Sequence, residues 1–218
     1  MENIMGDFTI TALDSPESLE SIRTVFPEEY QARKHQFRAE EHFAKKEYQK
    51  AVAEWTQSIR FCPQSAVYFT DRGNAYFYLE DHDHAIADYT ESIRLDPRYS
   101  NNYAYRAYSY LCKKNYNRAI EDSNRALKFD KKNADAYATR GQTFSAIGQY
   151  SKALKDLNHA IHLNPDEDEY WFERGKVYEA MGENSKAIDD YEKALSLKPD
   201  TEDYQKAYDK MLRTKVMN

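Results

Sequence analysis

The sequence contains few of the residues that break or crosslink a chain. Its 218 residues include 6 glycines, 6 prolines and 2 cysteines. Because an all-β chain needs turn residues at the end of every short strand, this composition excludes such a fold. The two cysteines, Cys62 and Cys112, show neither CxxC nor zinc-finger spacing, so we expect free thiols rather than a disulfide or a metal site.

Long hydrophobic runs are absent from the sequence as well. No apolar stretch approaches the ~20 residues that a membrane-spanning helix needs, so we expect no contact with a membrane. Residues 1–14 have neither the basic region nor the apolar region of a secretory signal, which favours a cytoplasmic location.

The negative charge of the chain is concentrated at one end. The net charge is -6, and residues 1–31 hold seven acidic residues and one basic residue, whereas the rest of the chain holds thirty of each sign. Nucleic-acid-binding proteins carry a continuous basic surface. No such stripe is present, so we expect no nucleic-acid partner.

What the sequence does contain is a unit of 34 residues, repeated five times without insertion. An arginine followed by a small residue recurs at this spacing, at Arg38, Arg72, Arg106, Arg140 and Arg174. Alanine recurs in the same way at Ala51, Ala85, Ala119, Ala153 and Ala187. A fixed period of this length is typical of a stacked array of repeats. Its hydrophobic spacing predicts two antiparallel helices per unit, at residues 67–79 and 84–95 in the second unit.

The repeat divides the chain into three parts. Residues 1–31 form an acidic leader with a short helix that begins at Ser15, and residues 202–218 form a capping helix. Between them lie the five repeats, at residues 32–65, 66–99, 100–133, 134–167 and 168–201. The leader either caps the exposed end of the array or occupies its groove, and the sequence leaves both open. The fold class predicted is all-α, a solenoid of antiparallel helix pairs.

Two sets of recurring side chains predict how each unit packs. An acidic residue follows every repeated arginine after sixteen positions, which predicts the ion pairs Arg38–Glu54, Arg72–Asp88, Arg106–Asp122, Arg140–Asp156 and Arg174–Asp190. Aromatic residues recur on the first helix, and we expect them in the core at Tyr76, Tyr110, Phe144 and Tyr178.

The unit resembles the tetratricopeptide repeat. The residues that carry this resemblance are, in the second unit, Gly73, Tyr76, Ala85, Tyr89, Ser92 and Pro97, with counterparts in the other four. Departures from the pattern are His42, Ser123 and Lys131. The resemblance implies a right-handed superhelix whose first helices line a concave groove that binds peptides or partner proteins. It implies neither catalysis nor a cofactor.

The same resemblance predicts which residues line the groove. One subclass grips the carboxylate at the end of a chaperone with Lys, Arg and Asn on three successive first helices, and in this chain only Asn74 fits that pattern. The groove residues expected here are Thr70, Asn74, Phe77, Tyr78, Asn101, Tyr105, Tyr108, Gln142, Phe172 and Lys176. Their amides, phenols and aromatic rings suit an extended or helical peptide. We therefore predict an adaptor or co-chaperone-like module, monomeric or weakly self-associating.

Two other functions remain open from the sequence. One is a dedicated chaperone of a secreted protein, similar to type III secretion chaperones, and the other is a self-assembling scaffold. Enzymatic function is not expected, because the sequence has no phosphate-binding loop, no GxSxG motif and no Cys/His pair of catalytic spacing. The histidines at His82, His84, His159 and His162 have no third ligand nearby, so we expect no bound metal.

Overall fold

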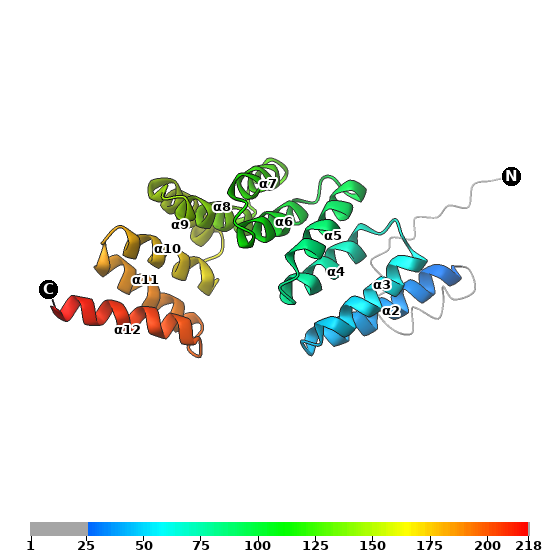
Figure 1. Ribbon diagram of the computed structural model, residues 1–218, viewed down its shortest axis with the longest axis horizontal. Helices are drawn as coiled ribbons and strands as arrows, with labels where there is room; N and C mark the ends of the chain where they lie inside the picture. Colours follow the sequence, from blue (N-terminus) through cyan, green and yellow to red (C-terminus); the bar gives the residue numbers. More distant parts are fainter. Residues whose placement is uncertain (1–25, 218) are drawn as a thin grey trace. The chain divides into compact units, whose positions relative to one another are not determined.

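The structure is a computed structural model that describes residues 26–217 and the side chains of residues 26–214. The described residues form only α-helices and short connections (Figure 1). The leader helix predicted from Ser15 lies outside the described residues. By contacts the chain divides into an N-terminal unit, residues 1–95, and a C-terminal unit, residues 96–218.

The N-terminal unit contains two antiparallel helix pairs. Its helices are α2 (Pro27–Ala44), α3 (Tyr48–Phe61), α4 (Ala66–Tyr78) and α5 (His82–Leu95). Helix α2 packs on α3 and α4 on α5, and α3 packs on α4. Each pair thus corresponds to one repeat, and its first helix is α2 or α4.

The C-terminal unit contains three further pairs and a final helix. Its helices are α6 (Ser100–Cys112), α7 (Tyr116–Phe129), α8 (Ala134–Ala146), α9 (Tyr150–Leu163), α10 (Asp168–Ala180), α11 (Asn184–Leu197) and α12 (Glu202–Met217). The first helices of the three repeats are α6, α8 and α10. Helix α12 packs on α11, where Met211 contacts Ile188 and Tyr191.

The turns between paired helices are tight and need one left-handed residue each. In the last two repeats this residue is glycine, at Gly148 and Gly182, with φ near +75°. The first three repeats use Lys46, Glu80 and Lys114 in the same conformation. The turn of the second repeat is shorter than predicted, because α5 begins two residues earlier than expected.

Side chains also stabilise the turn that lacks the repeated proline. Lys131 stands at the proline position, and the carboxylate of Asp130 accepts a hydrogen bond from the backbone N–H of Lys132 at 2.8 Å. The next residue, Asn133, caps α8 by accepting from the N–H of Ala136 at 2.9 Å. The Asp130 contact has a counterpart beside Pro97, where Asp96 accepts from the N–H of Arg98 at 3.1 Å, so the Asn133 cap is the feature that distinguishes this turn from that one.

Small residues allow the paired helices to approach closely. The repeated alanines on the second helices are fully buried. A Cβ added to Gly175 would lie 2.6 Å from Cε1 of Tyr191, and one added to Gly73 would lie 2.8 Å from Cε1 of Tyr89. Both tyrosines are buried, so the backbone of the first helix rests directly on these rings.

The prediction that the first-helix aromatics lie in the core is confirmed only in part, since Phe144 and Tyr178 pack against core clusters without being fully buried. Tyr76, Tyr110, Phe144 and Tyr178 are half-buried rather than buried. Cationic side chains lie over their rings: the Arg174 guanidinium, for example, is 5.8 Å from the ring centre of Tyr178. Fully buried first-helix residues, among them Tyr68, Tyr170 and Val177, join the second-helix side chains in the core.

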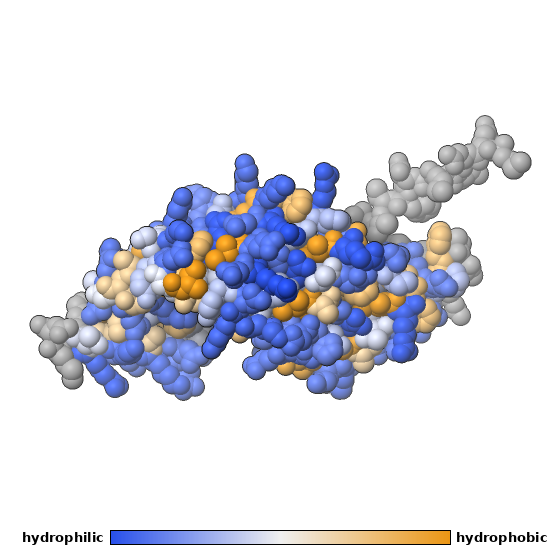
Figure 2. All heavy atoms as spheres, turned by 45° about the horizontal axis from the view of Figure 1, so that its top comes forward, coloured by the Kyte–Doolittle hydropathy of each residue, from blue (hydrophilic) through white to orange (hydrophobic). Residues whose placement is uncertain are grey.

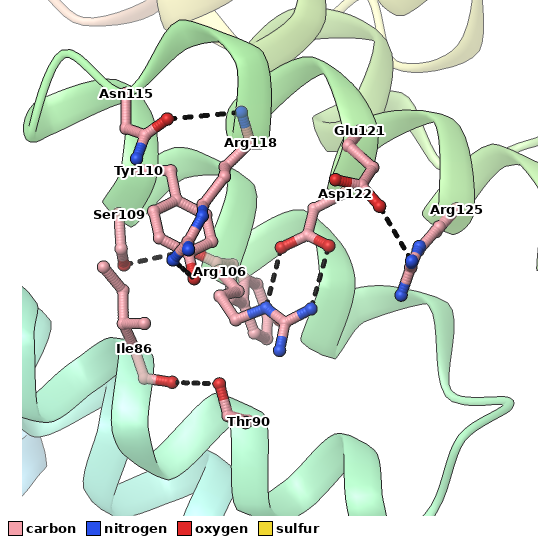
Figure 3. Close-up of polar contacts among 11 residues, drawn as sticks. Ile86, Thr90, Arg106, Ser109, Tyr110, Asn115, Arg118, Glu121, Asp122 and Arg125 are labelled. Carbon is pink, nitrogen blue, oxygen red and sulfur yellow. Dashed lines mark hydrogen bonds and ion pairs between the residues drawn. The ribbon is translucent and has the colours of Figure 1, made fainter.

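The predicted ion pairs form in four of the five repeats. In the third repeat Arg106 donates to both carboxylate oxygens of Asp122, at 2.7 and 2.9 Å (Figure 3). Equivalent two-point contacts join Arg72 to Asp88, Arg140 to Asp156 and Arg174 to Asp190. All four carboxylates are buried. The pairs therefore bind the two helices of each unit together.

The first repeat is the exception, and its prediction is wrong. The described side chains of Arg38 and Glu54 form no ion pair. Instead, Glu54 contacts Nδ1 of His35 at 2.6 Å, and Arg38 is exposed. His35 lies one turn before Arg38 on α2, so it reaches the same carboxylate from the neighbouring position.

Candidate functional site

Among the first-helix positions that vary between repeats, two flank the repeated arginine. The residue before it is Phe37, Asp71, Tyr105, Thr139 or Glu173, and the residue two places after it is Glu40, Asn74, Tyr108, Gln142 or Lys176. The scaffold of Arg–Asp pairs, alanines and glycines does not use these side chains. They are therefore the part of the first helices in which ligand recognition can differ between repeats.

In the N-terminal unit these positions line a pocket between the two repeats. Its lining residues are Glu40, Phe43, Ala44, Trp55, Asp71 and Asn74, and its volume is about 220 Å³. Helices α2 and α4 supply five of the six side chains, and α3 supplies Trp55. The pocket is open to solvent and combines two carboxylates with two aromatic rings.

The pKa of Asp71 is raised in this pocket. Removal from water raises the pKa of its carboxyl to about 7, and the negative charge of Glu40 contributes in the same direction. No donor or cation of the described residues contacts the Asp71 carboxylate. The pocket thus contains a desolvated carboxylate for which no cation or hydrogen-bond donor of the described residues compensates.

Trp55 is the residue of this pocket that the sequence did not reveal. Its side chain is buried, and among the described residues its indole N–H has no acceptor. The lack of an acceptor for a buried donor costs roughly 1–3 kcal/mol. The other repeats have Tyr, Ser or Leu at the equivalent position, so an indole N–H occurs at this position in the first repeat alone. This difference is the signal in the sequence that could have identified Trp55.

The four groove residues predicted in the N-terminal unit have different environments. Thr70 is buried, and its hydroxyl lies 2.7 Å from Ser92 Oγ within the helix pair, so it is engaged in the packing. Asn74 borders the pocket and accepts a hydrogen bond from the Tyr89 hydroxyl at 2.8 Å. Phe77 is half-buried, whereas Tyr78 is 57% exposed.

The exposed ring of Tyr78 belongs to an aromatic cluster beside the pocket. It stacks on Tyr48, with ring centres 5.0 Å apart, and meets the edge of Phe43 at 5.4 Å. Phe43 in turn contacts Trp55 at 5.6 Å. A continuous aromatic surface therefore leads from the pocket wall to solvent.

In the C-terminal unit, predicted residues from different repeats meet on one face. The hydroxyl of Tyr108 on α6 donates to Glu169 on α10 at 3.1 Å, and the amide of Gln142 on α8 donates to the same oxygen at 3.2 Å. Because the contact of Tyr108 skips a whole repeat, the first helices of all three repeats converge here. Burial, followed by the charge of Glu169, raises the pKa of Tyr108 above its usual value.

The same face continues along α10. Glu173 is desolvated, which raises the pKa of its carboxyl, and its partner Lys176 lies 2.8 Å away. The ammonium of Lys176 is half exposed and also lies 5.5 Å from the ring centre of Phe172. Phe172 is half-buried against Tyr191 and Tyr204.

The remaining two predicted residues lie on α6. Asn101 is half-buried and accepts a hydrogen bond from the Asn133 amide at 2.8 Å, which links two repeats. Tyr105 is also half-buried. The network of Tyr108, Gln142 and Glu169 is thus the place where the structure brings predicted residues together, since Asn101 is engaged in inter-repeat packing.

Metal-ligand clusters and membrane-spanning helices are absent from the described residues. Nowhere in residues 26–214 do three His, Cys, Asp or Glu side chains gather as metal ligands. None of the helices described is both long and apolar enough to cross a bilayer. On the face drawn in Figure 2, hydrophilic side chains predominate and hydrophobic ones form small patches.

Comparison with protein families explains the repeat. A profile of the tetratricopeptide repeat matches residues 66–99 and 169–201, and a second TPR profile matches residues 141–182. The chain is a tetratricopeptide repeat protein. This TPR fold is that of a protein–protein interaction module. No curated protein sequence matches the chain.

Solved structures share this TPR fold at low sequence identity. TTC0263, a thermophilic TPR protein of Thermus thermophilus, is 20% identical, with 83% of this chain and 98% of that chain covered and a TM-score of 0.73. PilW, a type IV pilus biogenesis factor, is 16% identical over 84% of each chain, with a TM-score of 0.74. YrrB, a TPR protein with an unusual peptide-binding site, is 16% identical, with 87% of this chain and 96% of that chain covered and a TM-score of 0.60.

Proposed function

We propose that this TPR protein is a non-enzymatic adaptor that binds a peptide segment of a partner protein on the faces of its first helices. The observation that carries the proposal is the network of Tyr108, Gln142 and Glu169, which gathers polar side chains of three repeats on one face. These groups contact one another across repeats, and we expect each to exchange its contact for one with a peptide backbone.

The chemistry of the network suits a peptide main chain. The Gln142 amide both donates and accepts, the Tyr108 hydroxyl does the same, and Glu169 accepts from peptide N–H groups. Tyrosine adds a large contact area at a low cost in side-chain entropy. A bound peptide therefore replaces the internal hydrogen bonds of the network with its own, so that few hydrogen bonds are lost on binding.

Peptide selection tests this proposal. The full-length chain is immobilised and screened against a phage library of random dodecapeptides, and the dissociation constants of enriched peptides are measured. We expect the double change Tyr108→Ala, Gln142→Ala to weaken binding about ten-fold or more, since interface anchors contribute over 1 kcal/mol each. The control is Gln205→Ala on the exposed surface of α12, which should bind like the wild type.

The two alternative functions make different predictions for the same protein sample. A self-assembling scaffold gives a molecular mass that rises with concentration in light scattering, whereas the proposed adaptor stays at one mass. A dedicated chaperone protects one unfolded client and has no preference among short peptides. Equal recovery of all library sequences would therefore contradict the adaptor proposal.

A further inference from the structure

The pocket of the N-terminal unit has two polar groups that lack partners in the described part of the chain. The carboxylate of Asp71 has no cation or donor, and the buried indole N–H of Trp55 has no acceptor. Among the same described residues, the carboxylate of Glu40 accepts only from the neutral amide of Gln36, at 2.8 Å. The pocket thus offers negative charge and a hydrogen-bond donor.

The composition of the pocket lining indicates the charge and polarity of a complementary ligand. Two of the six lining residues are acidic, two are aromatic, and none is Lys, Arg or His. The repeated aspartates of the second helices are bound to arginine, as Asp88 is to Arg72. Asp71 is different, because the repeated arginine that follows it is already committed to Asp88.

We propose that this pocket binds the side chain of a lysine or arginine of the partner peptide, an inference that rests on the proposed function. The ammonium or guanidinium group pairs with Asp71 and Glu40, and this attraction compensates the cost of desolvating the Asp71 carboxylate. The aliphatic stem lies along the rings of Phe43 and Trp55, as long basic side chains do on apolar surfaces.

The backbone of the same ligand residue completes the match. A carbonyl oxygen of the peptide accepts from the Trp55 indole N–H at the wall of the pocket, and the Asn74 side chain of the same lining offers a further polar contact. The volume of about 220 Å³ admits one side chain rather than a folded segment. The pocket therefore selects a single basic residue within a longer peptide.

Two other occupants are disfavoured by charge. Residues 1–25 contain five acidic residues and Arg23 as their single base, so the pocket repels most of that segment. A second copy of the chain carries the same net charge of -6. A partner segment rich in basic residues is the complementary ligand.

The test begins with the peptides enriched by the full-length protein. We expect Lys or Arg to be enriched at one position in the wild-type selection and to lose that enrichment with Asp71→Asn. For one enriched peptide, replacement of the basic residue by norleucine should weaken binding to the wild type about ten-fold or more and to Asp71→Asn by less than about two-fold. Circular dichroism verifies that the variant is folded.

A matched pair of variants controls for long-range charge. Glu40→Gln removes a carboxylate of the pocket, whereas Glu41→Gln removes its exposed neighbour, which pairs with Lys45 at 2.6 Å outside the pocket. We expect Glu40→Gln to weaken the lysine peptide several-fold and Glu41→Gln to leave it nearly unchanged. Equal effects of the two would show general charge attraction and overturn the proposed pocket.

The other outcomes are equally decisive. The proposed pocket is wrong if the enriched peptides have no position that favours Lys or Arg. It is also wrong if Asp71→Asn enriches the same basic position as the wild type. In both cases the adaptor proposal stands. Failure of the wild type to enrich any peptide overturns both. Tighter peptide binding by Arg23→Gln places the chain's own leader in the pocket instead. A dimer that Asp71→Asn dissociates, seen by light scattering, identifies a second copy as the occupant.

Discussion

The hydroxyl of Tyr108 donates to the carboxylate of Glu169 at 3.1 Å, although 61 residues separate the two in the chain. This contact passes over the fourth repeat and draws α6 and α10 to a common face. Stacked repeats ordinarily contact only their neighbours. The variable side chains of the first helices therefore do more than coat a surface, because they also connect repeats that are not adjacent.

Removal of this hydroxyl should have a measurable cost. We expect Tyr108→Phe to lower the unfolding free energy by about 1 kcal/mol, because a half-buried carboxylate loses one donor. Urea unfolding followed by circular dichroism measures the change. The control is Tyr150→Phe, whose hydroxyl makes no hydrogen bond within the described residues, and equal losses from both changes would contradict the role of the contact.

The Arg–Asp pairs give the sharpest prediction about stability. Asp122 is buried against Arg106, whereas its chain neighbour Glu121 is exposed and pairs with Arg125 on the surface (Figure 3). We expect Asp122→Asn to cost about 3 kcal/mol, because it removes the charge of the buried carboxylate that pairs with the half-buried guanidinium of Arg106. Glu121→Gln should cost less than about 0.5 kcal/mol. Both values come from denaturant unfolding, and a small effect at Asp122 would mean that water replaces the carboxylate.

The close approach at Gly175 predicts a compensating pair. An added Cβ would lie 2.6 Å from the ring of Tyr191, so we expect Gly175→Ala to destabilise the chain by about 1–3 kcal/mol. The third repeat has Ala107 where Ser123 replaces the ring. In a Tyr191→Ser background the penalty of Gly175→Ala should therefore vanish. A double-mutant cycle of unfolding free energies measures this coupling, and additive effects would contradict it.

The carboxyl of Asp71 makes stability depend on pH in a defined direction. Its pKa is about 7 in the folded chain and ~3.9 in an unfolded chain, so the folded state binds more protons between these values. This contribution to stability is fully present below pH ~4 and is lost as the pH rises through about 7. Glu40 on α2 is the charged group that acts on it, while Trp55 and Asn74 are neutral.

Asp71→Asn should remove this dependence. We expect the variant to exceed the wild type in unfolding free energy at pH 8 by about 2–4 kcal/mol and to match it near pH 4. Thermal unfolding across this range measures the difference. Asp83→Asn, which changes an exposed carboxylate of α5, is the control. A difference between Asp71→Asn and the wild type that does not change with pH would contradict the raised pKa.

The scaffold could be predicted from the sequence because the repeat samples it five times. The pairing of Arg106 with Asp122 follows from one spacing that recurs in every unit. The contact of Glu54 with His35 in place of Arg38 could not be predicted in this way. Both basic residues of α2 lie within reach of the Glu54 carboxylate, and the side-chain packing decides which of them pairs with it. The half-burial of Tyr76 also depends on the curvature of the helix pair, which the spacing does not specify.

The candidate sites were predicted only in part, for a related reason. Variable positions identify themselves by not repeating, and this singled out Tyr108, Gln142 and Lys176. The environment of Asp71 was not visible, since the sequence does not state which cations are already bound elsewhere. The position of Thr70 also varies between repeats, yet Thr70 is buried within the helix pair, where its hydroxyl forms a hydrogen bond with Ser92 on α5.

Hydrogen–deuterium exchange with a bound peptide tests directly whether the ligand lies on the first helices. The full-length chain is saturated with a peptide enriched in the selection, and the amide exchange of each helix is compared with that of the free protein. We expect slower exchange in the first helices, α4, α6, α8 and α10 among them, with little change in the second helices. Protection confined to the second helices α5, α7, α9 and α11, or none in any helix, would contradict it.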